Sequence, residues 1–324
     1  MMINDTITIG TLELKNRLVM PPMATRKSAA GIVTEELLEY YRSRAENNQF
    51  GLIITEHSCI SEGGRADKDQ LAITEDAQIP ALRRLTDAIH SGGSLTFAQL
   101  NHSGSAANPG AICDHVSASN VNIPAKKLLP GPRPLTVDEI REIEMLFTAA
   151  AVRAVSAGYD GVEIHCAHGY LLDEFYSPLT NRRSDEYGPQ NMENRTRFLR
   201  ETLKLVKEAV NVPVAVRLGG ADYLPGGATE EDAVEACRLL EKEGADLLDL
   251  SGGMCFYTRP GHSEAGYFGT MTEKIKKAVS VPVLLTGGVN TEAEAEELLR
   301  SGKADLIGLG RAVFKDADWR NSSR

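Results

Sequence analysis

Short apolar runs alternate with amphipathic helical patterns along almost the whole chain, and this alternation limits the fold more than any other feature. The strand candidates are residues 17–21, 51–56, 94–100, 161–165, 214–218, 247–250, 283–286 and 306–308. Helical patterns occupy residues 34–47, 79–91, 137–157, 193–210, 230–244, 272–279 and 291–301. The strand candidates are near-continuous apolar runs rather than alternating ones, which is typical of a parallel sheet buried on both faces. Eight strand–helix repeats predict an α/β fold, a (β/α)8 TIM barrel.

Three further features refine this prediction. Residues 6–15 alternate around Gly10-Thr11 and predict an N-terminal β-hairpin that plugs the bottom of the barrel. Long loops, residues 101–135 and 166–192, follow the third and fourth strands, and long loops in compact domains are usually functional. A doubly wound sheet would need a GxGxxG turn after its first strand, where this chain has Pro21-Pro22-Met23. No low-complexity linker interrupts the repeats, so we expect one domain over residues 1–324.

The composition excludes several classes of protein. With 45 acidic and 35 basic residues the formal net charge is −10, which argues against nucleic acid or an anionic membrane as the main partner. No apolar run approaches the roughly 20 residues of a membrane helix, and no signal peptide precedes the first strand. The five cysteines form no CxxC pair and suggest neither a disulfide framework nor an iron–sulfur run. We expect a cytoplasmic protein.

The segment His165-Cys-Ala-His168-Gly-Tyr170 directly follows the fourth strand candidate. Two imidazoles and a phenol are thus expected near one strand end, on the face of the barrel that carries the active site in this fold. The imidazoles can hold one oxygen atom, and the phenol is a weak acid. The spacing alone leaves two alternatives open: a structural histidine pair, or a metal pair with a third ligand from His102, Asp173 or Glu174. No zinc-binding pattern of the His-Glu-x-x-His type is present.

Other polar and glycine residues stand at the ends of further strand candidates. Gln99 and Arg217 end the third and fifth strands. Glycines follow the seventh and eighth strands, where barrels build phosphate sites, and Arg311 adds a cationic fork beside them. These glycines are Gly287, Gly288 and Gly310, with Gly252 and Gly253 after the sixth strand. The pattern predicts a site for a phosphorylated ligand.

The continuation of the histidine segment carries a longer motif. Leu171-Leu-Asp-Glu-Phe-Tyr-Ser-Pro is followed by Asn181-Arg-Arg-Ser-Asp-Glu-Tyr-Gly and then by Glu193-Asn-Arg-Thr-Arg-Phe. The chain resembles the old yellow enzyme family of FMN-dependent ene-reductases, whose signature is HxxHGYLxxxFLSPxxNxRxDxYGG followed by ENRxRF. The resemblance extends from Asn16-Arg17 to Gly310-Arg311.

The resemblance implies a function. Such an enzyme takes hydride from NADH or NADPH onto FMN and reduces activated C=C bonds of α,β-unsaturated carbonyl or nitro compounds. His165 and His168 would bind the substrate oxygen, in the His/His variant of the family, and Tyr170 would protonate the α-carbon. The implied FMN contacts are Pro22, Met23, Ala24, Gln99, Arg217, Gly252, Gly253, Gly287, Gly288, Gly310 and Arg311. No metal is expected, the partner is a small-molecule activated alkene, and homo-oligomerisation stays open.

The chain departs from the family pattern in several places, three of which bear on the chemistry. Ala24 stands where many relatives carry Cys or Thr near the flavin C4 oxygen, which predicts a lower flavin potential unless Thr25 substitutes. Arg26 stands at a substrate-facing position and is a candidate substrate contact. Longer relatives carry an iron–sulfur cluster after the barrel, whereas this sequence ends at Arg324 without such cysteines, so we expect direct electron transfer from NAD(P)H to FMN.

Two other functions remain as alternatives. One is a flavin barrel that works mainly in electron transfer or in dehydrogenation of another substrate. The more remote one is a metal-dependent barrel lyase or isomerase.

Overall fold

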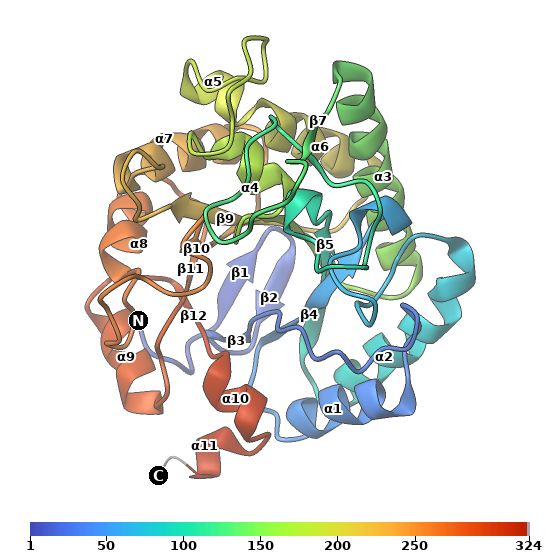
Figure 1. The fold of residues 1–324 in the computed structure, drawn as a ribbon. Helices are drawn as coiled ribbons and strands as arrows, with labels where there is room; N and C mark the ends of the chain where they lie inside the picture. The colour runs from blue at the N-terminus through green and yellow to red at the C-terminus, as the bar shows by residue number, and fades with distance from the viewer. Residues whose placement is uncertain (323–324) are drawn as a thin grey trace.

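Eight parallel strands close into a barrel in the computed structural model, which describes residues 1–322 (Figure 1). The last two residues of the expected domain, 323 and 324, lie outside this range. Around the barrel the order is β3, β4, β5, β8, β9, β10, β11 and β12. The strands are β3 Leu18–Met20, β4 Leu52–Cys59, β5 Leu95–Asn101, β8 Gly161–Cys166, β9 Val214–Ala221, β10 Leu247–Gly252, β11 Val283–Thr286 and β12 Leu306–Gly308. All eight strand candidates and the TIM-barrel prediction are confirmed.

Helices surround the barrel, and most match the predicted ranges. They are α1 Glu35–Ala45, α2 Ile79–Ser91, α3 Val137–Ser156, α5 Met192–Arg195, α6 Arg197–Ala209, α7 Glu230–Lys242, α8 Gly269–Lys276, α9 Glu292–Arg300, α10 Arg311–Lys315 and α11 Trp319–Ser322. Thr34, Thr136, Thr229 and Thr291 cap four of them through their side chains. The helix expected over residues 193–210 is divided at Thr196, whose hydroxyl donates to the Met192 carbonyl. No helix within residues 1–322 has the length and hydropathy of a membrane span.

The N-terminal hairpin closes one end of the barrel (Figure 1). Strands β1 Ile7–Ile9 and β2 Leu12–Leu14 pair antiparallel, with Ile7 opposite Leu14. The inward side chains of the hairpin pack against those of the barrel strands in one apolar cluster: Ile9, Leu14, Val19, Leu52, Ile54, Phe97, Ala215, Leu247, Leu284 and Leu306. The predicted hairpin plug is therefore confirmed.

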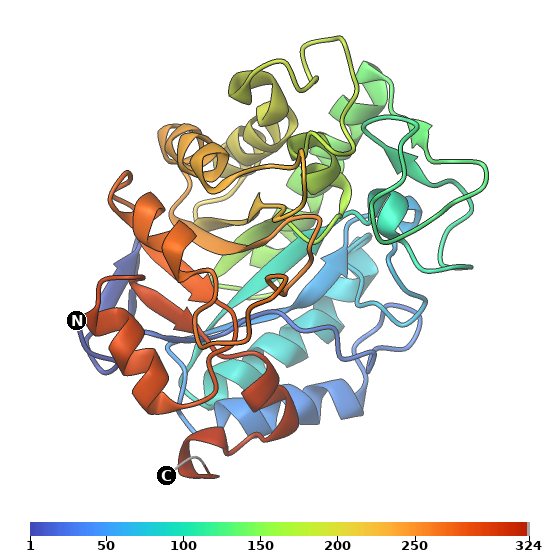
Figure 2. The same cartoon turned by 60° about the vertical axis from the view of Figure 1, so that its left-hand side comes forward.

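The two long loops lie side by side on one flank of the molecule (Figure 2). The loop after β5 carries the 3-10 turn η3 Gly104–Ala106 and the short strands β6 Val116–Ser117 and β7 Arg133–Pro134, and the loop after β8 carries α4 Leu171–Tyr176. Two further 3-10 turns, η1 Glu62–Gly64 and η2 Asp76–Gln78, follow β4.

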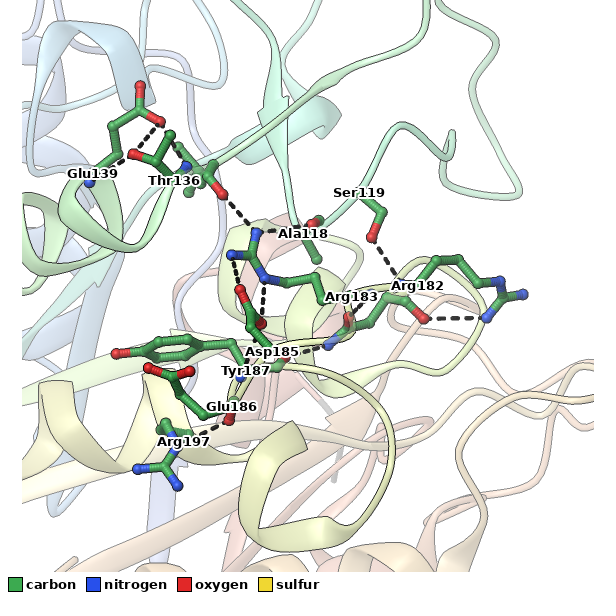
Figure 3. Close-up of polar contacts among 12 residues, drawn as sticks. Ala118, Ser119, Thr136, Glu139, Arg182, Arg183, Asp185, Glu186, Tyr187 and Arg197 are labelled. Atoms are coloured by element: carbon green, nitrogen blue, oxygen red, sulfur yellow. Dashed lines mark hydrogen bonds and ion pairs between the residues drawn. The ribbon is translucent and has the colours of Figure 1, made fainter.

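Arg183 joins these loops (Figure 3). Its guanidinium donates to Asp185 at 2.6 and 3.0 Å, to the Leu135 carbonyl at 2.6 Å and to the Ala118 carbonyl at 3.2 Å. The NRRSDEYG part of the motif therefore has a structural role: the bidentate pair with Asp185 orients the guanidinium, and the bonds to the Ala118 and Leu135 carbonyls hold the two loops together.

Candidate active site

A cavity of about 430 Å³ opens at the carboxyl ends of the barrel strands, opposite the hairpin. Its volume is within the range of small-molecule and cofactor sites. It is lined by Pro21, Pro22, Met23, Ala24, His57, Gln99, His165, His168, Tyr170, Arg217, Ser251, Tyr257, Tyr267, Thr286, Gly287, Gly288, Val289, Gly308, Gly310, Arg311 and Phe314. Most residues predicted from strand ends far apart in the sequence thus meet in one place.

His165, His168 and Tyr170 form one wall of this cavity. The ring centroids of His165 and His168 lie 5.1 Å apart, and those of His165 and Tyr170 lie 5.0 Å apart. His168 has a φ of 61°, which a residue with a side chain rarely adopts. The N–H of Gly169 donates to the buried Asp173 carboxylate at 2.7 Å and holds this turn in place. Backbone strain supported in this way is typical of functional sites.

The electrostatic environment keeps all three groups uncharged at neutral pH. Burial, with smaller contributions from cationic and imidazole neighbours, lowers the pKa of His165 and of His168 well below the usual value of 6.5. Burial and the Asp67 carboxylate raise the pKa of Tyr170 to about 12. The wall therefore presents neutral imidazole N–H donors and a protonated phenol. In His168, Nε2 lies 2.8 Å from the Ser251 hydroxyl, which leaves Nδ1 for a ligand.

Gln99 and Arg217 form the floor of the cavity, and the buried carboxyl groups of Glu163 and Asp249 lie beside them. Gln99 Nε2 donates to Glu163 Oε1 at 2.8 Å, so the amide oxygen of Gln99 is left for a ligand N–H. Arg217 Nε lies 3.2 Å from Asp249 Oδ2, a buried ion pair. Burial and the Asp249 carboxylate raise the pKa of Glu163, so Arg217 has Asp249 as its main counter-ion.

The loops after β11 and β12 form the opposite side of the cavity. Gly288 has a φ of 74°, and a Cβ there would lie 2.6 Å from the Glu264 carbonyl oxygen, so only glycine fits. Gly287, Gly310 and Arg311 line the same side. Glycines allow a ligand to approach the backbone closely, and the Arg311 guanidinium suits a phosphate.

These residues fit FMN on structural grounds. His165 Nδ1 and Arg217 Nε are buried within residues 1–322 without a hydrogen bond of good geometry, and buried polar atoms normally have a partner. Gln99 and Arg217 would hold the pyrimidine edge of the flavin. Gly287, Gly288, Gly310 and Arg311 would hold its phosphate.

Three predicted residues lie outside this cavity. Gly252 and Gly253 pack inside the protein, where a Cβ on Gly253 would collide with Asp222, and Ser251 lines the cavity in their place. These two glycines do not line the cavity, and their contact with the cofactor stays a prediction. Arg26 lies 3.3 Å from Asp67, with 65% of its side chain exposed, over a separate hollow of about 100 Å³ beyond Tyr170.

The candidates for a third metal ligand point elsewhere. Glu174 accepts from Ser105, Asp173 accepts from Gly169, and His102 Nδ1 accepts from the N–H of Gly104. Within residues 1–322 no three His, Cys, Asp or Glu side chains lie close enough to hold one ion. The metal-dependent alternative thus has no ligand set in this part of the chain.

The sequence analysis missed several cavity residues, above all His57. His57 lies directly after the second strand candidate, and polar residues at strand ends were the signal that identified Gln99 and Arg217. Tyr257, Tyr267 and Phe314 come from loops and from α10, and no local pattern marks them.

Comparison with known proteins is consistent with this site. Residues 4–323 match the model of the NADH:flavin oxidoreductase / NADH oxidase family. The chain is 36% identical over 324 residues to a protein named NADH oxidase from Thermoanaerobacter brockii, covering 98% of this chain and 50% of that protein. It is 38% identical over 320 residues to a protein named metal reductase from Desulforamulus reducens, covering 97% of this chain and 47% of that protein. The chain spans about half the length of these curated relatives.

Solved structures show the same barrel. An old yellow enzyme homologue from Zymomonas mobilis superposes with a TM-score of 0.85 at 30% identity, covering 98% of this chain and 90% of that one. Morphinone reductase in complex with tetrahydroNAD gives 0.86 at 26% identity, covering 99% and 91%. A 2-naphthoyl-CoA reductase complex gives 0.91 at 26% identity, covering 99% of this chain and 51% of that one. FMN and a nicotinamide dinucleotide are the cofactor and reductant that this family uses. The chain therefore belongs to the NADH:flavin oxidoreductase / NADH oxidase family, that of old yellow enzyme.

Proposed function

We propose that residues 1–324 form a single FMN-binding domain that reduces activated C=C bonds, in α,β-unsaturated carbonyl or nitro compounds, at the expense of NADH or NADPH. The observation that carries the proposal is the wall of His165, His168 and Tyr170: two neutral N–H donors and one protonated phenol meet within ring-centroid distances of 5.0 and 5.1 Å.

His165 and His168 bind the carbonyl or nitro oxygen of the substrate. Because burial keeps both rings neutral, each offers an N–H donor without the cost of a buried charge. These donors stabilise the negative charge that develops on the oxygen as the double bond is reduced, and one preorganised donor of this type contributes about 2.7–4 kcal/mol.

Tyr170 protonates the α-carbon of the substrate. A phenol with a raised pKa is a weak acid, and it transfers its proton only to a strongly basic carbon such as that of an enolate. The rings of Tyr170 and His165 pack at an interplanar angle of 78°, so the imidazole donor and the phenolic acid act on neighbouring atoms of one small substrate.

The floor and the glycine side of the cavity hold the cofactor. Gln99 and Arg217 would bind the polar edge of the flavin, Gly287, Gly288, Gly310 and Arg311 would bind its phosphate, and Pro22, Met23 and Ala24 would contact its ring; all of them line the cavity. When bound, FMN would supply the hydride-transfer chemistry that links NAD(P)H to the β-carbon of the alkene.

The test is anaerobic flavin spectroscopy on the purified protein. We expect a yellow protein that NADH or NADPH bleaches and that 2-cyclohexenone re-oxidises. A yellow protein that the enone leaves bleached would exclude ene-reduction while retaining the flavin site.

A second function has one specific observation in its favour. The relatives from Thermoanaerobacter brockii and Desulforamulus reducens are named NADH oxidase and metal reductase. Those names indicate acceptors other than an alkene for those proteins. If dioxygen or a ferric chelate re-oxidises the bleached protein much faster than any enone, electron transfer to such an acceptor is the main activity.

A further inference from the structure

His57 is a third imidazole of the cavity, and a bulge in β4 places it there. Thr55 pairs with Ala98 and Ser58 pairs with Leu100, so Glu56 and His57 together oppose the single residue Gln99 on β5. A β-bulge of this kind redirects a side chain and occurs often beside active sites. The His57 ring lies 5.5 Å from the Tyr170 ring and 6.3 Å from the His165 ring, centroid to centroid.

Gln70 determines which nitrogen of His57 carries the proton. The N–H of Ala66 donates to Gln70 Oε1 at 2.6 Å, so the amide oxygen of Gln70 faces the backbone. Its Nε2 therefore faces His57, where it contacts Nδ1 at 2.5 Å and donates to the backbone carbonyl at 3.1 Å. Because an amide NH2 has no acceptor, Nδ1 must accept, and the ring proton must be on Nε2.

The Nε2–H of His57 is available on the cavity side. Within residues 1–322 no protein atom accepts from it, and the ring lines both the main cavity and the smaller hollow beyond Tyr170. Burial and Arg217 lower the pKa of His57 to about 4, with a smaller opposing effect of Asp67, so the ring is neutral at neutral pH. Arg217 and Asp67 are the charged groups that shift the pKa of His57, and Asp67 also affects that of Tyr170. Arg26, Glu56 and Asp69 line the smaller hollow as well.

We propose that His57 is a further functional residue, whose Nε2–H donates to the phenolic oxygen of Tyr170 once that oxygen gives up its proton and stabilises the phenolate. This inference rests on the proposed role of Tyr170 as the acid. In that step the O–H bond breaks, a C–H bond forms at the α-carbon, and the electron pair of the O–H bond stays on the Tyr170 oxygen. The phenolate then recovers a proton from solvent. His57 donates its hydrogen bond to the phenolate and changes its own protonation at no point.

A titration of residue 170 tests this without any turnover. A fluorinated tyrosine at position 170 of the FMN-loaded protein is more acidic than tyrosine and can be titrated by 19F NMR at moderate pH. Hydrogen bonds to charged groups contribute enough for roughly a tenfold effect or more. We expect His57→Phe, which keeps a ring of similar size, to lower the acid dissociation constant of residue 170 at least tenfold.

His57→Gln is the matched variant, because its side-chain amide carries an N–H at about the reach of Nε2. It should restore the dissociation constant to within about threefold of the parent protein. Equal constants in the parent and in His57→Phe would overturn the proposal. Flavin absorbance and far-ultraviolet circular dichroism check that each variant is folded and loaded.

A measurement on the unsubstituted chain gives a second, independent test. The 15N spectrum of His57 should show a proton on Nε2 and an acceptor at Nδ1, and the reverse tautomer would overturn the proposal. Neither test measures alkene reduction. If the enone experiment fails while both tests succeed, the ene-reductase proposal is wrong and the His57–Tyr170 pair stands.

Discussion

The two ends of the barrel are built from the same strands but from opposite chemistry. On β5, Phe97 is followed two residues later by Gln99, and on β9 and β10 the corresponding pairs are Ala215 and Arg217, and Leu247 and Asp249. Residues i and i+2 point to the same face of a strand. On these three strands, therefore, the side chains of one face change from apolar to polar over two residues toward the carboxyl end. Below that layer the hairpin seals an apolar core, and above it lies the cavity.

This difference separates stability from chemistry in space. The lower end contributes apolar burial, which stabilises the fold without any dependence on pH. The upper end buries carboxyl groups, a guanidinium and imidazoles. Burial of these polar groups costs free energy, and they occur where a ligand can complete their hydrogen bonds. Substitutions at the two ends should therefore change different quantities.

The largest expected effect is on the rate of reaction at the upper end. Tyr170→Phe keeps the ring but removes the acid, and loss of a general acid costs about 10²- to 10⁴-fold. The rate of alkene reduction, measured by stopped-flow with the pre-reduced protein and 2-cyclohexenone, should fall by that factor. Reduction by NAD(P)H and the melting temperature should not change. An alkene-reduction rate equal to that of the parent would remove Tyr170 from the mechanism.

The next effect is on stability at the lower end. Leu14 is 1% exposed in the apolar cluster beneath the barrel. Leu14→Ala should reduce the free energy of unfolding by about 2–5 kcal/mol, measured by chemical denaturation, and leave kcat per bound FMN unchanged. Glu13→Ala, an exposed neighbour on the same hairpin strand, is the matched control and should change neither quantity. A large loss of kcat in Leu14→Ala would show that the two ends are coupled.

A third effect depends on pH. Burial raises the pKa of Glu56 to about 7 from the usual value of 4.5, against the opposing hydrogen bonds from Thr25. Because the folded protein binds this proton more tightly than the unfolded chain, the contribution of Glu56 to stability is greatest below pH 4.5 and is lost as the pH rises to about 7. Glu56→Gln stays neutral and removes this loss, which amounts to at most about 3 kcal/mol.

Denaturation of the parent protein and of Glu56→Gln at several pH values measures that difference. The stability gained by the variant should grow between pH 4.5 and 7 and then level off. Parallel curves for the two proteins would contradict the assignment. The exposed Glu13→Gln serves as control and should give no pH-dependent difference.

The smallest effect concerns the flavin potential. Ala24 lines the cavity and offers no donor, and Thr25 cannot substitute, since its hydroxyl donates to Glu56 at 2.5 Å. Ala24→Cys adds a weak donor worth about 0.5–1.5 kcal/mol, which should raise the two-electron potential of FMN by about 10–30 mV. Potentiometric titration measures the change, with Ala24→Val as a control of similar size and no donor. An unchanged potential in Ala24→Cys would refute this role.

Most of the fold could be predicted because its signals are local. Each barrel strand contains a largely apolar run, and the four threonine caps precede their helices directly. The helices α4 and α10 were missed, since six and five residues are too few for a helical period to emerge. The break at Thr196 was missed because only three-dimensional packing distinguishes it from a helix interior.

The site divides in the same way. His165, His168 and Tyr170 were found because they lie within six residues of one another and because barrel enzymes have their active sites at strand ends. His57 was missed because the bulge that turns it inward exists only when β4 pairs with β5. Gly252 and Gly253 were placed in the cofactor site by their position after β10, but they pack against Asp222, and Ser251 faces the cavity.

By itself the sequence determined the eight strands, the hairpin, the family and the histidine–tyrosine segment, since each depends on residues that are close together in the chain. Only the tertiary structure decided which groups share a cavity, which nitrogen of His57 carries a proton, and which carboxyl groups are protonated. Those properties depend on burial and on neighbours from other strands. The physical reason is that a pKa and a tautomer are set by the surroundings of a side chain in space, whereas a strand is set largely by its own residues.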